Sequence, residues 1–469
     1  MKAEVTPQRR AAYEVLRRVF EHGAWADRAL PAAAERHRLD RRERSQAQRL
    51  AYGAVQRRGT ADHLIEALAG RPVARLDPPV LAALRLGLYE LLHSDSVPGH
   101  AAVDQAVELA KSAVAAQRPA GARRAAAAAG LVNAVLRRAA RERSTLLASI
   151  EDSTPEGAAV LHSYPEWLAA MWWDELGADG TRSLMAAMNE PAETCLRVNA
   201  LKADPALLVA ELIAAEGGVE RPAAAAPLAP AEALVVHGPL TDALRRRIDR
   251  GELVAQARVS QAVVSLLDPR PGQRVLDLCA APGIKTSAIA ARLGNRGEIV
   301  AVEVDPGRAR QLRELCERLG ATCVRVVEGD AASVDISGGY DRILVDPPCS
   351  DLGTLNSRPD ARWRKSPALI ERLAQIQRTI LAHAAGALDD RGTLVYSTCT
   401  ISARENESRV AELADRDSTL RADDLGASYP GLAARLDRRC LQTRPDRDRT
   451  DGFFVARLRR GRVPAGGGG

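Results

Sequence analysis

The stretch RVLDLCAAPGIKTSAIAARLG, residues 274–294, decides the fold of the C-terminal half. Its first part, RVLDLC, is a short apolar run typical of a buried strand, and SAIAARLG has the apolar spacing of a helix. Between them lies a turn of small residues stiffened by Pro282, where the backbone can come close to a ligand. The stretch therefore predicts one strand–turn–helix unit of an α/β fold.

The same alternation continues to the end of the chain. Apolar runs typical of strands recur at 298–305, 323–329, 342–346 and 392–398, and helical patterns separate them. Such alternation predicts a doubly wound, mostly parallel sheet over residues 251–462. We expect residues 463–469 to be a disordered tail.

The N-terminal third differs in both pattern and charge. Residues 1–145 show helical spacing with no clear strand, which predicts an all-α domain, and residues 160–250 predict a small α+β middle domain. Of 66 Lys and Arg, 25 lie in residues 1–150 against 15 of the 60 Asp and Glu, so the net charge of +6 comes from this third. This asymmetry indicates a domain that binds a polyanion, or else a solvated Arg-rich helical surface.

Acidic and small residues at the strand ends predict a nucleotide-like cofactor. In an open parallel sheet the ligand lies beyond the carboxyl ends of the strands. Glu303, ending the second strand, can accept hydrogen bonds from ribose hydroxyls, and Asp330, after the third, can meet an adenine edge. Lys285 and Thr286 open a helix whose N-terminal amides favour a carboxylate. The turn lacks the glycine spacing of a P-loop or a nicotinamide site.

Two cysteines follow the next two strands. Cys349 lies in DPPCS, residues 346–350, and Cys399 in YSTCT, residues 396–400, so adjacent strand ends would bring both thiols into one cleft. This set fits the methylation of a pyrimidine at carbon 5. A thiolate that adds to carbon 6 makes carbon 5 nucleophilic, a carboxyl group such as Asp346 supports the charge at ring nitrogen 3, and a second thiol can assist release.

The remaining cysteines carry no such signal. We expect Cys195, Cys316, Cys323 and Cys440 to act as small buried apolar residues, and neither a zinc site nor a disulfide framework is predicted. The segment TLNSRPDARWRKSP, residues 354–367, mixes arginines with Trp363 and predicts contact with a single-stranded nucleic acid; an exposed loop is the alternative.

These motifs together resemble the RNA cytosine-5 methyltransferases that use S-adenosylmethionine. The resemblance rests on DLCAAPGIKT, DPPCS with RPDARW, and YSTCT with ENE. The N-terminal region is similar to the RNA-binding NusB domain in the runs YELL, VPGHAAVDQAVELAK and GLVNAVLRR. The family's middle domain is similar to the run LRVNALK. It implies a Rossmann-like methyltransferase domain, a NusB-like domain, and a cytidine of 16S ribosomal RNA as substrate. It also implies that Cys399 is the nucleophile, that Cys349 aids product release, and that Asp346 faces the cytosine. The contacts it implies for S-adenosylmethionine are Cys279, Ala280, Ala281, Pro282, Gly283, Ile284, Lys285, Glu303, Asp330 and Asp346.

The chain departs from that family pattern at a few positions. Ile284 and Asp351 stand where the family usually has glycine. An acid often follows the Gln of the family's entry motif, whereas Gln256 is followed here by Ala257 and Arg258. Two alternatives stay open: a non-catalytic RNA-binding or ribosome assembly factor that kept the fold, and a DNA cytosine-5 methyltransferase with Cys349 as nucleophile. The sequence has no signal-peptide pattern or membrane-length apolar run, so we expect a cytoplasmic monomer without metal or membrane contact.

Overall fold

The computed structural model describes residues 4–94, 97–117, 121–223 and 227–461, so the predicted tail at 463–469 lies outside the described residues. Contacts divide the chain into two compact units. The N-terminal unit comprises Met1–Glu190 and Leu355–Lys365, and the C-terminal unit comprises Pro191–Thr354 and Ser366–Gly469. The chain therefore passes from one unit to the other three times.

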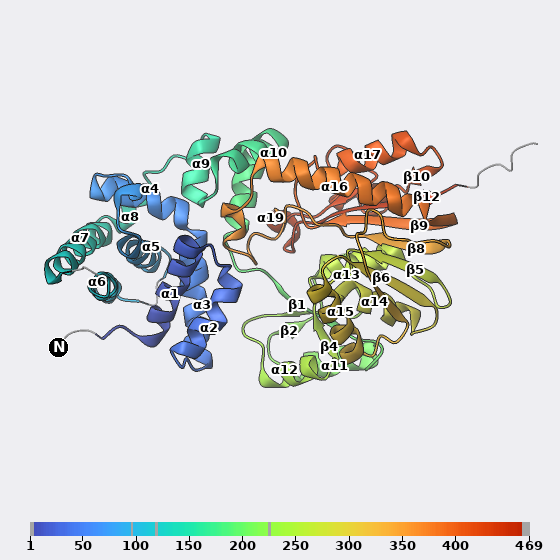
Figure 1. Cartoon of the computed structure of the whole chain (residues 1–469), viewed down its shortest axis with the longest axis horizontal. Coiled ribbons are helices and arrows are strands. Elements are labelled where there is room, and N and C mark those ends of the chain that lie inside the picture. Colours follow the sequence, from blue (N-terminus) through green and yellow to red (C-terminus); the bar gives the residue numbers. More distant parts are fainter. Residues whose placement is uncertain (1–3, 95–96, 118–120, 224–226, 462–469) are drawn as a thin grey trace, which may run out of the picture. The chain divides into compact units, whose positions relative to one another are not determined.

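The N-terminal unit is helical throughout its described part (Figure 1). Its helices are α1 (Pro7–His22), α2 (Ala26–Arg36), α3 (Arg41–Gln56), α4 (Arg58–Ala69), η1 (Val73–Arg75), α5 (Pro78–His93), α6 (Gly99–Ala115), α7 (Ala122–Arg141), α8 (Arg143–Leu146), α9 (Pro155–His162), α10 (Glu166–Ala187) and η2 (Ala361–Trp363). The predicted all-α character is confirmed for the described part of residues 1–145. Helices α9 and α10 also belong to this unit, although the predicted middle domain, residues 160–250, includes α10 and the last residues of α9.

Alanine and glycine let these helices pack closely. A Cβ atom at Gly53 of α3 would lie only 2.0 Å from the ring of Tyr89 in α5, and one at Gly87 would lie 2.5 Å from Leu136 in α7. Small residues thus hold α5 in the centre of the bundle, where Leu84, Leu86 and other apolar side chains are buried. Close-packed contacts of this kind, rather than large aromatics, stabilise the unit.

The segment 355–365 is part of the core of the N-terminal unit. Arg362 is fully buried and donates to the Asn189 side chain (2.8 Å) and to the Ser163 carbonyl (3.1 Å). The Trp363 indole donates to the Val55 carbonyl at 2.9 Å, and Arg364 bonds to the backbone that follows α1. The prediction that these three residues bind nucleic acid was therefore wrong: most of their donors bond to the unit's own backbone and side chains.

The C-terminal unit contains a small antiparallel sheet in the order β2-β3-β1-β4. Its strands are β1 (Thr194–Val198), β2 (Val219–Glu220), β3 (Ala233–Val236) and β4 (Leu253–Ala255). Helices α11 (Pro205–Ala215) and α12 (Asp242–Asp249) contribute Leu208, Leu212 and Leu244 to one apolar cluster with these strands. The expected small α+β fold is thus present.

The larger sheet has the strand order β10-β12-β9-β8-β5-β6-β7, and β11 pairs with β12 (Figure 1). The strands are β5 (Arg274–Leu278), β6 (Glu298–Glu303), β7 (Val324–Glu328), β8 (Tyr340–Val345), β9 (Leu388–Thr398), β10 (Leu420–Ala422), β11 (Leu441–Gln442) and β12 (Phe454–Arg460). Strands β5 to β9 run parallel and β12 runs antiparallel to β9. The predicted doubly wound, mostly parallel sheet is confirmed.

Helices cover both faces of this sheet. Alternate strand residues enter two separate apolar clusters: Val275 packs with α13 (Arg258–Leu267), α14 (Ile284–Leu293) and α15 (Pro306–Leu319), whereas Leu276 packs with α16 (Pro367–Gly386) and α17 (Glu407–Arg416). The remaining short helices are α18 (Leu425–Ser428), η3 (Pro430–Leu432) and α19 (Pro445–Asp448). Burial on both faces explains why the strands read as continuous apolar runs. Across the described ranges, no helix has both the length and the apolarity needed to span a bilayer.

Candidate active site

The predicted site residues lie at the carboxyl ends of the parallel strands. The strand order reverses between β5, which continues to β6 and β7, and β8, which continues to β9. Such a reversal opens a crevice at the carboxyl edge of a doubly wound sheet. The turn after β5 enters this edge, and α14 begins at Ile284 with Gly283 as its N-cap residue.

Gly283 is required by the shape of that turn. Its φ of +104° is in a region that residues with a Cβ rarely adopt, and an added Cβ would lie 2.6 Å from the Leu312 side chain of α15. Cys279 also has a positive φ, of +64°. Burial raises the pKa of its thiol, which agrees with a packing or backbone role.

The acids at the next strand ends differ in burial. Glu303 is 2% exposed, and its carboxylate accepts the Asp305 backbone N–H at 3.0 Å. Val304, the next residue, is 64% exposed, which is unusual for a large apolar side chain beside a strand end. An acid and an exposed apolar side chain at this point suit the ribose and the ring face of a nucleoside. Asp330 is exposed and accepts the Ala332 backbone N–H at 2.9 Å, so its contact with an adenine edge stays a prediction.

The structure brings the two predicted thiols together. Strands β8 and β9 are parallel neighbours, and Cys349 and Cys399 follow their ends. Their sulfur atoms lie 3.2 Å apart, and both side chains are half-buried. A ring that reaches one sulfur would therefore also lie close to the other.

Asp346 and Lys285 form an ion pair next to these thiols. The Lys285 ammonium lies 2.6 Å from one carboxylate oxygen, and the Ser397 hydroxyl donates to the other at 2.9 Å. Burial alone would lower the pKa of Lys285, but the charge of Asp346, its hydrogen bond and the smaller effects of Cys399 and Asp277 together raise the pKa. Lys285, which follows the turn after β5, thus fixes the carboxylate of Asp346 in the DPPCS motif.

Asp351 is a site residue that the sequence analysis did not assign. Its carboxylate Oδ1 lies 3.1 Å from the Cys399 sulfur and 3.7 Å from the Cys349 sulfur. The pKa of Cys399 is raised well above its usual value by the hydrogen bond with Cys349, by burial, and by the negative charges of Asp351 and Asp346. The resting nucleophile candidate is therefore a thiol rather than a thiolate.

A buried acid, Glu405, supports the two thiol-bearing loops. Its carboxylate accepts the Ser350 backbone N–H at 2.9 Å, the Ser350 hydroxyl, and the Gln377 amide at 3.0 Å. Burial raises the pKa of Glu405. The neighbouring Asn406 donates to the Thr400 carbonyl at 3.1 Å. No role for the ENE run was predicted from the sequence. The pattern that could have indicated one is the presence of two polar residues, Glu405 and Asn406, soon after the predicted site residue Cys399.

The other cysteines lie apart from this cleft. Cys195, Cys316 and Cys440 are buried, Cys323 is half-buried, and burial raises the pKa of each thiol. Within the described ranges, one group of possible metal ligands lies within 4.8 Å, and it consists of Cys349, Asp351 and Cys399. Arg258, one of the departures from the family pattern, is buried and pairs with Glu193 at 2.9 Å, so it has a structural role.

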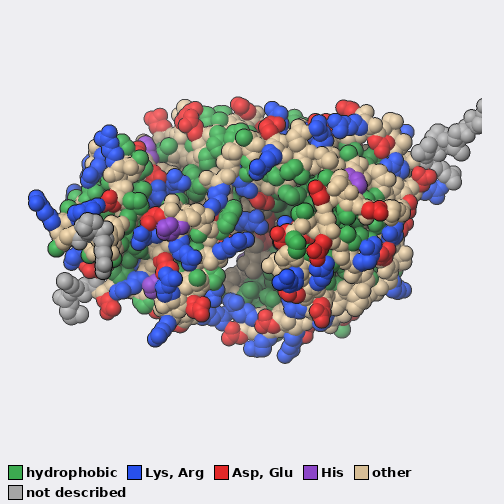
Figure 2. Space-filling view, viewed as in Figure 1, with side chains coloured by type: hydrophobic (Ala, Val, Ile, Leu, Met, Phe, Trp, Pro, Cys, Tyr) green, Lys and Arg blue, Asp and Glu red, His purple; other side chains and the backbone are tan. Residues whose placement is uncertain are grey.

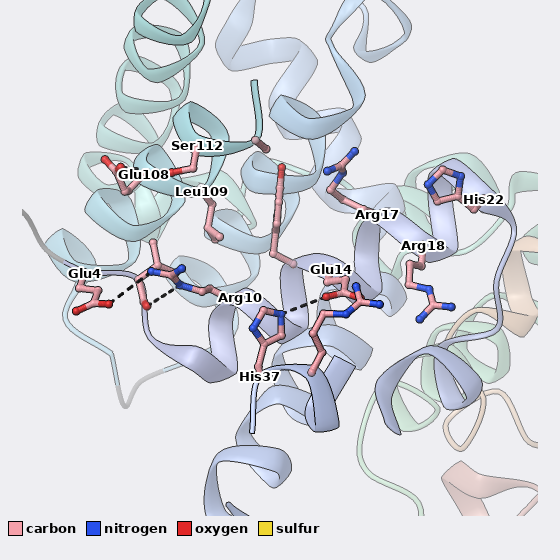
Figure 3. Close-up of a pocket in the computed structure, with 14 residues that line it drawn as sticks. Glu4, Arg10, Glu14, Arg17, Arg18, His22, His37, Glu108, Leu109 and Ser112 are labelled. Carbon is pink, nitrogen blue, oxygen red and sulfur yellow. Dashed lines mark hydrogen bonds and ion pairs between the residues drawn. The ribbon is translucent and has the colours of Figure 1, made fainter. Parts of the chain in front are cut away.

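The N-terminal unit has a cavity of about 880 Å³ between α1, α2 and α6, lined by basic side chains (Figure 3). Several of these side chains are paired: Arg36 and His37 both contact Glu14, at 2.6 and 3.1 Å. Arg18 also lines the cavity. On the face shown in Figure 2, Lys and Arg side chains of this unit are interspersed with Asp and Glu. Acidic side chains therefore partly balance the basic charge on this face of the N-terminal unit. The cavity is one site where several basic side chains lie close together.

Three family models match consecutive parts of the chain. Residues 6–141 match the NusB family, residues 164–240 match the ferredoxin-like domain of RsmF/B-like methyltransferases, and residues 264–459 match the 16S rRNA methyltransferase RsmB/F family. The three matches follow the order expected from the sequence motifs.

Individual proteins match over almost the whole chain. A probable ribosomal RNA small subunit methyltransferase B of Synechocystis is 32% identical, over 96% of this chain and 99% of that protein. A putative methyltransferase of Mycobacterium tuberculosis is 36% identical, over 97% and 96%. The crystal structure of the protein PH0851 superposes with a TM-score of 0.77 at 26% identity, covering 98% of this chain and 100% of that one.

Proposed function

The chain belongs to the RsmB/F family of 16S ribosomal RNA methyltransferases, and on that premise we propose that it methylates carbon 5 of a cytidine in 16S ribosomal RNA. The observation that carries this proposal is the pair of sulfur atoms, 3.2 Å apart, at the ends of two adjacent parallel strands. A methyltransferase acting on an exocyclic amino group would need no thiol, whereas carbon 5 of cytosine needs a nucleophile at carbon 6.

Members of the family use S-adenosylmethionine, which supplies an electrophilic methyl group when bound. The residues present fit such a group. The left-handed backbone of Gly283 shapes the turn after β5, buried Glu303 ends β6, and exposed Val304 offers an apolar surface beside it. Residues 279–285, Glu303, Asp330 and Asp346 would hold the cofactor.

In this reaction Cys399 adds to carbon 6 of the cytosine, which makes carbon 5 nucleophilic. Asp346 faces the ring edge at nitrogen 3, and Lys285 and Ser397 hold its two oxygens in place. A hydrogen bond from the protonated form of this carboxyl group to nitrogen 3 stabilises the negative charge that the ring gains. Cys349, 3.2 Å from the Cys399 sulfur, aids release of the enzyme after methylation.

The N-terminal unit would bind the RNA through its basic side chains, and the target cytidine must be unpaired or flipped out to reach the cleft. Acting on ribosomal RNA implies a cytoplasmic location, and we expect the monomer to be active. No step in this scheme assigns a role to a metal.

Transfer of a tritiated methyl group to 16S ribosomal RNA from a deletion strain, followed by bisulfite sequencing, tests the proposal. We expect one cytidine to become resistant to conversion, and Cys399→Ala to abolish the transfer. Cys323→Ala is the matched control, because its thiol is also half-buried but lies outside the cleft. If the parent protein binds this RNA but transfers no methyl group, a non-catalytic assembly role replaces the proposal.

A further inference from the structure

We propose that Asp351 is a further catalytic residue, which accepts the proton of the Cys399 thiol as the sulfur adds to carbon 6 and returns it when the sulfur leaves. This inference rests on the proposed function, because it concerns the same nucleophile. A carboxylate in direct contact with a nucleophilic thiol can act as its general base if the geometry allows the proton to pass.

The geometry is specific. Asp351 Oδ1 is 3.1 Å from the Cys399 sulfur, well inside hydrogen-bond distance for a sulfur donor, and 3.7 Å from that of Cys349. The carboxylate therefore contacts both sulfurs of the cleft. Within a general-base step, heavy-atom contact of this kind is the first requirement.

The backbone around Asp351 holds the carboxylate in this place. Its φ is +58°, in the left-handed region that aspartate tolerates better than most residues. Two residues later, the Gly353 N–H donates to the Cys399 carbonyl at 3.0 Å, and the Gly353 carbonyl accepts from Gly452 at 2.8 Å. A Cβ at Gly353 would lie 1.8 Å from the Gly452 carbonyl oxygen, so this turn is packed directly onto its neighbour.

The other charged groups of the cleft leave the thiol in need of a base. Both oxygens of Asp346 accept hydrogen bonds, one from Lys285 and one from Ser397, and the charge of Lys285 is paired with Asp346. Glu405 is tied to Ser350 and Gln377. The second thiol, Cys349, and the two acids Asp346 and Asp351 all disfavour a resting thiolate at Cys399. A thiol held protonated in this way must lose its proton during the attack.

The proposed step balances in atoms and charge. The S–H bond of Cys399 breaks and its proton moves to Asp351 Oδ1, while the sulfur electron pair forms the bond to carbon 6 and the electrons of the 5,6 double bond move into the ring. After methylation, the proton on carbon 5 leaves to solvent, and its bonding electrons restore the 5,6 double bond as the bond from carbon 6 to sulfur breaks. The sulfur takes the electron pair of that bond, and the neutral Asp351 returns its proton to the departing thiolate.

Two measurements on Asp351→Asn separate this role from a structural one. The first is the rate of the covalent RNA adduct in a Cys349→Ala background. We expect Asp351→Asn to slow adduct formation about 100-fold near pH 7, and less at higher pH, where the thiolate forms without a base. Asp351→Glu should recover part of the rate. Affinities for RNA and S-adenosylmethionine should stay unchanged.

The second measurement is alkylation of Cys399 by iodoacetamide without RNA, followed by peptide mass spectrometry. Removing a negative charge 3.1 Å from the sulfur favours the thiolate, so alkylation at pH 7 should become faster in Asp351→Asn. Opposite changes in the two rates support the proposal. Adduct formation that stays the same or rises together with alkylation would overturn it, because Asp351 would then only suppress the thiolate.

The control is Asp390→Asn, an exposed acid on β9 of the same unit, which should change neither rate. Failure of this inference is distinguishable from failure of the proposed function. If the parent protein methylates the RNA and Cys399→Ala does not, but Asp351→Asn forms the adduct at the parental rate, only the role of Asp351 is rejected. If the parent forms no 5-methylcytidine, the proposed function itself is wrong.

Discussion

Asp277 is a fully buried acid directly below the cofactor turn, at the end of β5. Its carboxylate accepts a hydrogen bond from the Thr286 hydroxyl at 2.7 Å, and burial raises its pKa to about 7. An unfolded aspartate has a pKa of about 3.9. The folded chain therefore binds a proton at this group that the unfolded chain has already released between about pH 4 and pH 7.

The consequence is a pH dependence with a definite sign. The protonated group favours the folded state fully below about pH 4, and this contribution is lost as the pH rises through about 7. Asp277→Asn keeps an acceptor for Thr286 but cannot titrate. We expect its free energy of unfolding, measured by urea titration from pH 4 to 8, to fall less with pH than that of the parent, by at most about 4 kcal/mol. Parallel curves for the two proteins would contradict this.

Single residues of the site could be predicted where a strand end fixes them. Cys349, Cys399 and Lys285 each follow a recognisable apolar strand, and the topology of a parallel sheet then brings them to one edge. Asp351 and Glu405 could not be predicted in the same way. Their contacts depend on a left-handed backbone turn and on a loop that returns from β9, neither of which has a periodic signal.

Among the elements, the segment 355–365 is the least expected. The chain leaves the C-terminal unit at Thr354, shortly after the DPPCS motif, and returns to it at Ser366, where α16 begins. The segment's mixture of arginines and tryptophan is typical of a nucleic-acid contact, but the same side chains also suit a buried cation among backbone carbonyls. Arg362 stacks on the Tyr164 ring at 3.9 Å, which composition alone could not show.

This element should be important for stability. Arg362→Met removes a buried cation together with its bonds to Ser163 and Asn189, and leaves those acceptors without a partner. We expect a loss of about 2–4 kcal/mol in the free energy of unfolding, measured by chemical denaturation. Arg358→Ala, an exposed residue of the same segment, serves as the control and should change stability by less than about 0.5 kcal/mol. If Arg362→Met lowered the free energy of unfolding as little as Arg358→Ala does, the buried side chain of this segment would not stabilise the core.

The strands and helices themselves were largely predictable. The sheet strands are buried on both faces and therefore give continuous apolar runs, and the intervening helices have amphipathic spacing. The partner of each strand could not be predicted in this way. The antiparallel strand β12 lies near the end of the chain and pairs with β9, so its place in the sheet depends on long-range pairing. Residues 166–187 show helical spacing, but that spacing does not indicate to which unit the helix belongs.

At the scale of the whole molecule, the proposed function divides the work between two units. The N-terminal unit holds the excess of basic residues, and the C-terminal unit holds the thiols and the cofactor turn. Binding through phosphates should then be separable from chemistry. Affinity carried by cations depends on salt, because each neutralised phosphate releases counterions.

Arg18 tests this division. It lines the basic cavity, whereas Arg36 in the same cavity is paired with Glu14 at 2.6 Å. We expect Arg18→Gln to weaken binding of 16S ribosomal RNA fragments and to reduce the slope of log affinity against log salt by about 0.7 to 1. Arg36→Gln should change that slope less. The rate of adduct formation at saturating RNA should stay at the parental value for both, and a large fall in that rate would argue against the division.

The proposed reaction requires the sulfur of Cys399 to bond to carbon 6 of the target cytidine. The most direct test is to incubate Cys349→Ala with 16S ribosomal RNA and S-adenosylmethionine, isolate the covalent complex on a denaturing gel, and identify the cross-linked peptide by mass spectrometry. We expect a stable adduct through Cys399 that disappears in the Cys349→Ala, Cys399→Ala double variant. An adduct through Cys349 in Cys399→Ala, or full methylation activity of Cys399→Ala, would contradict it.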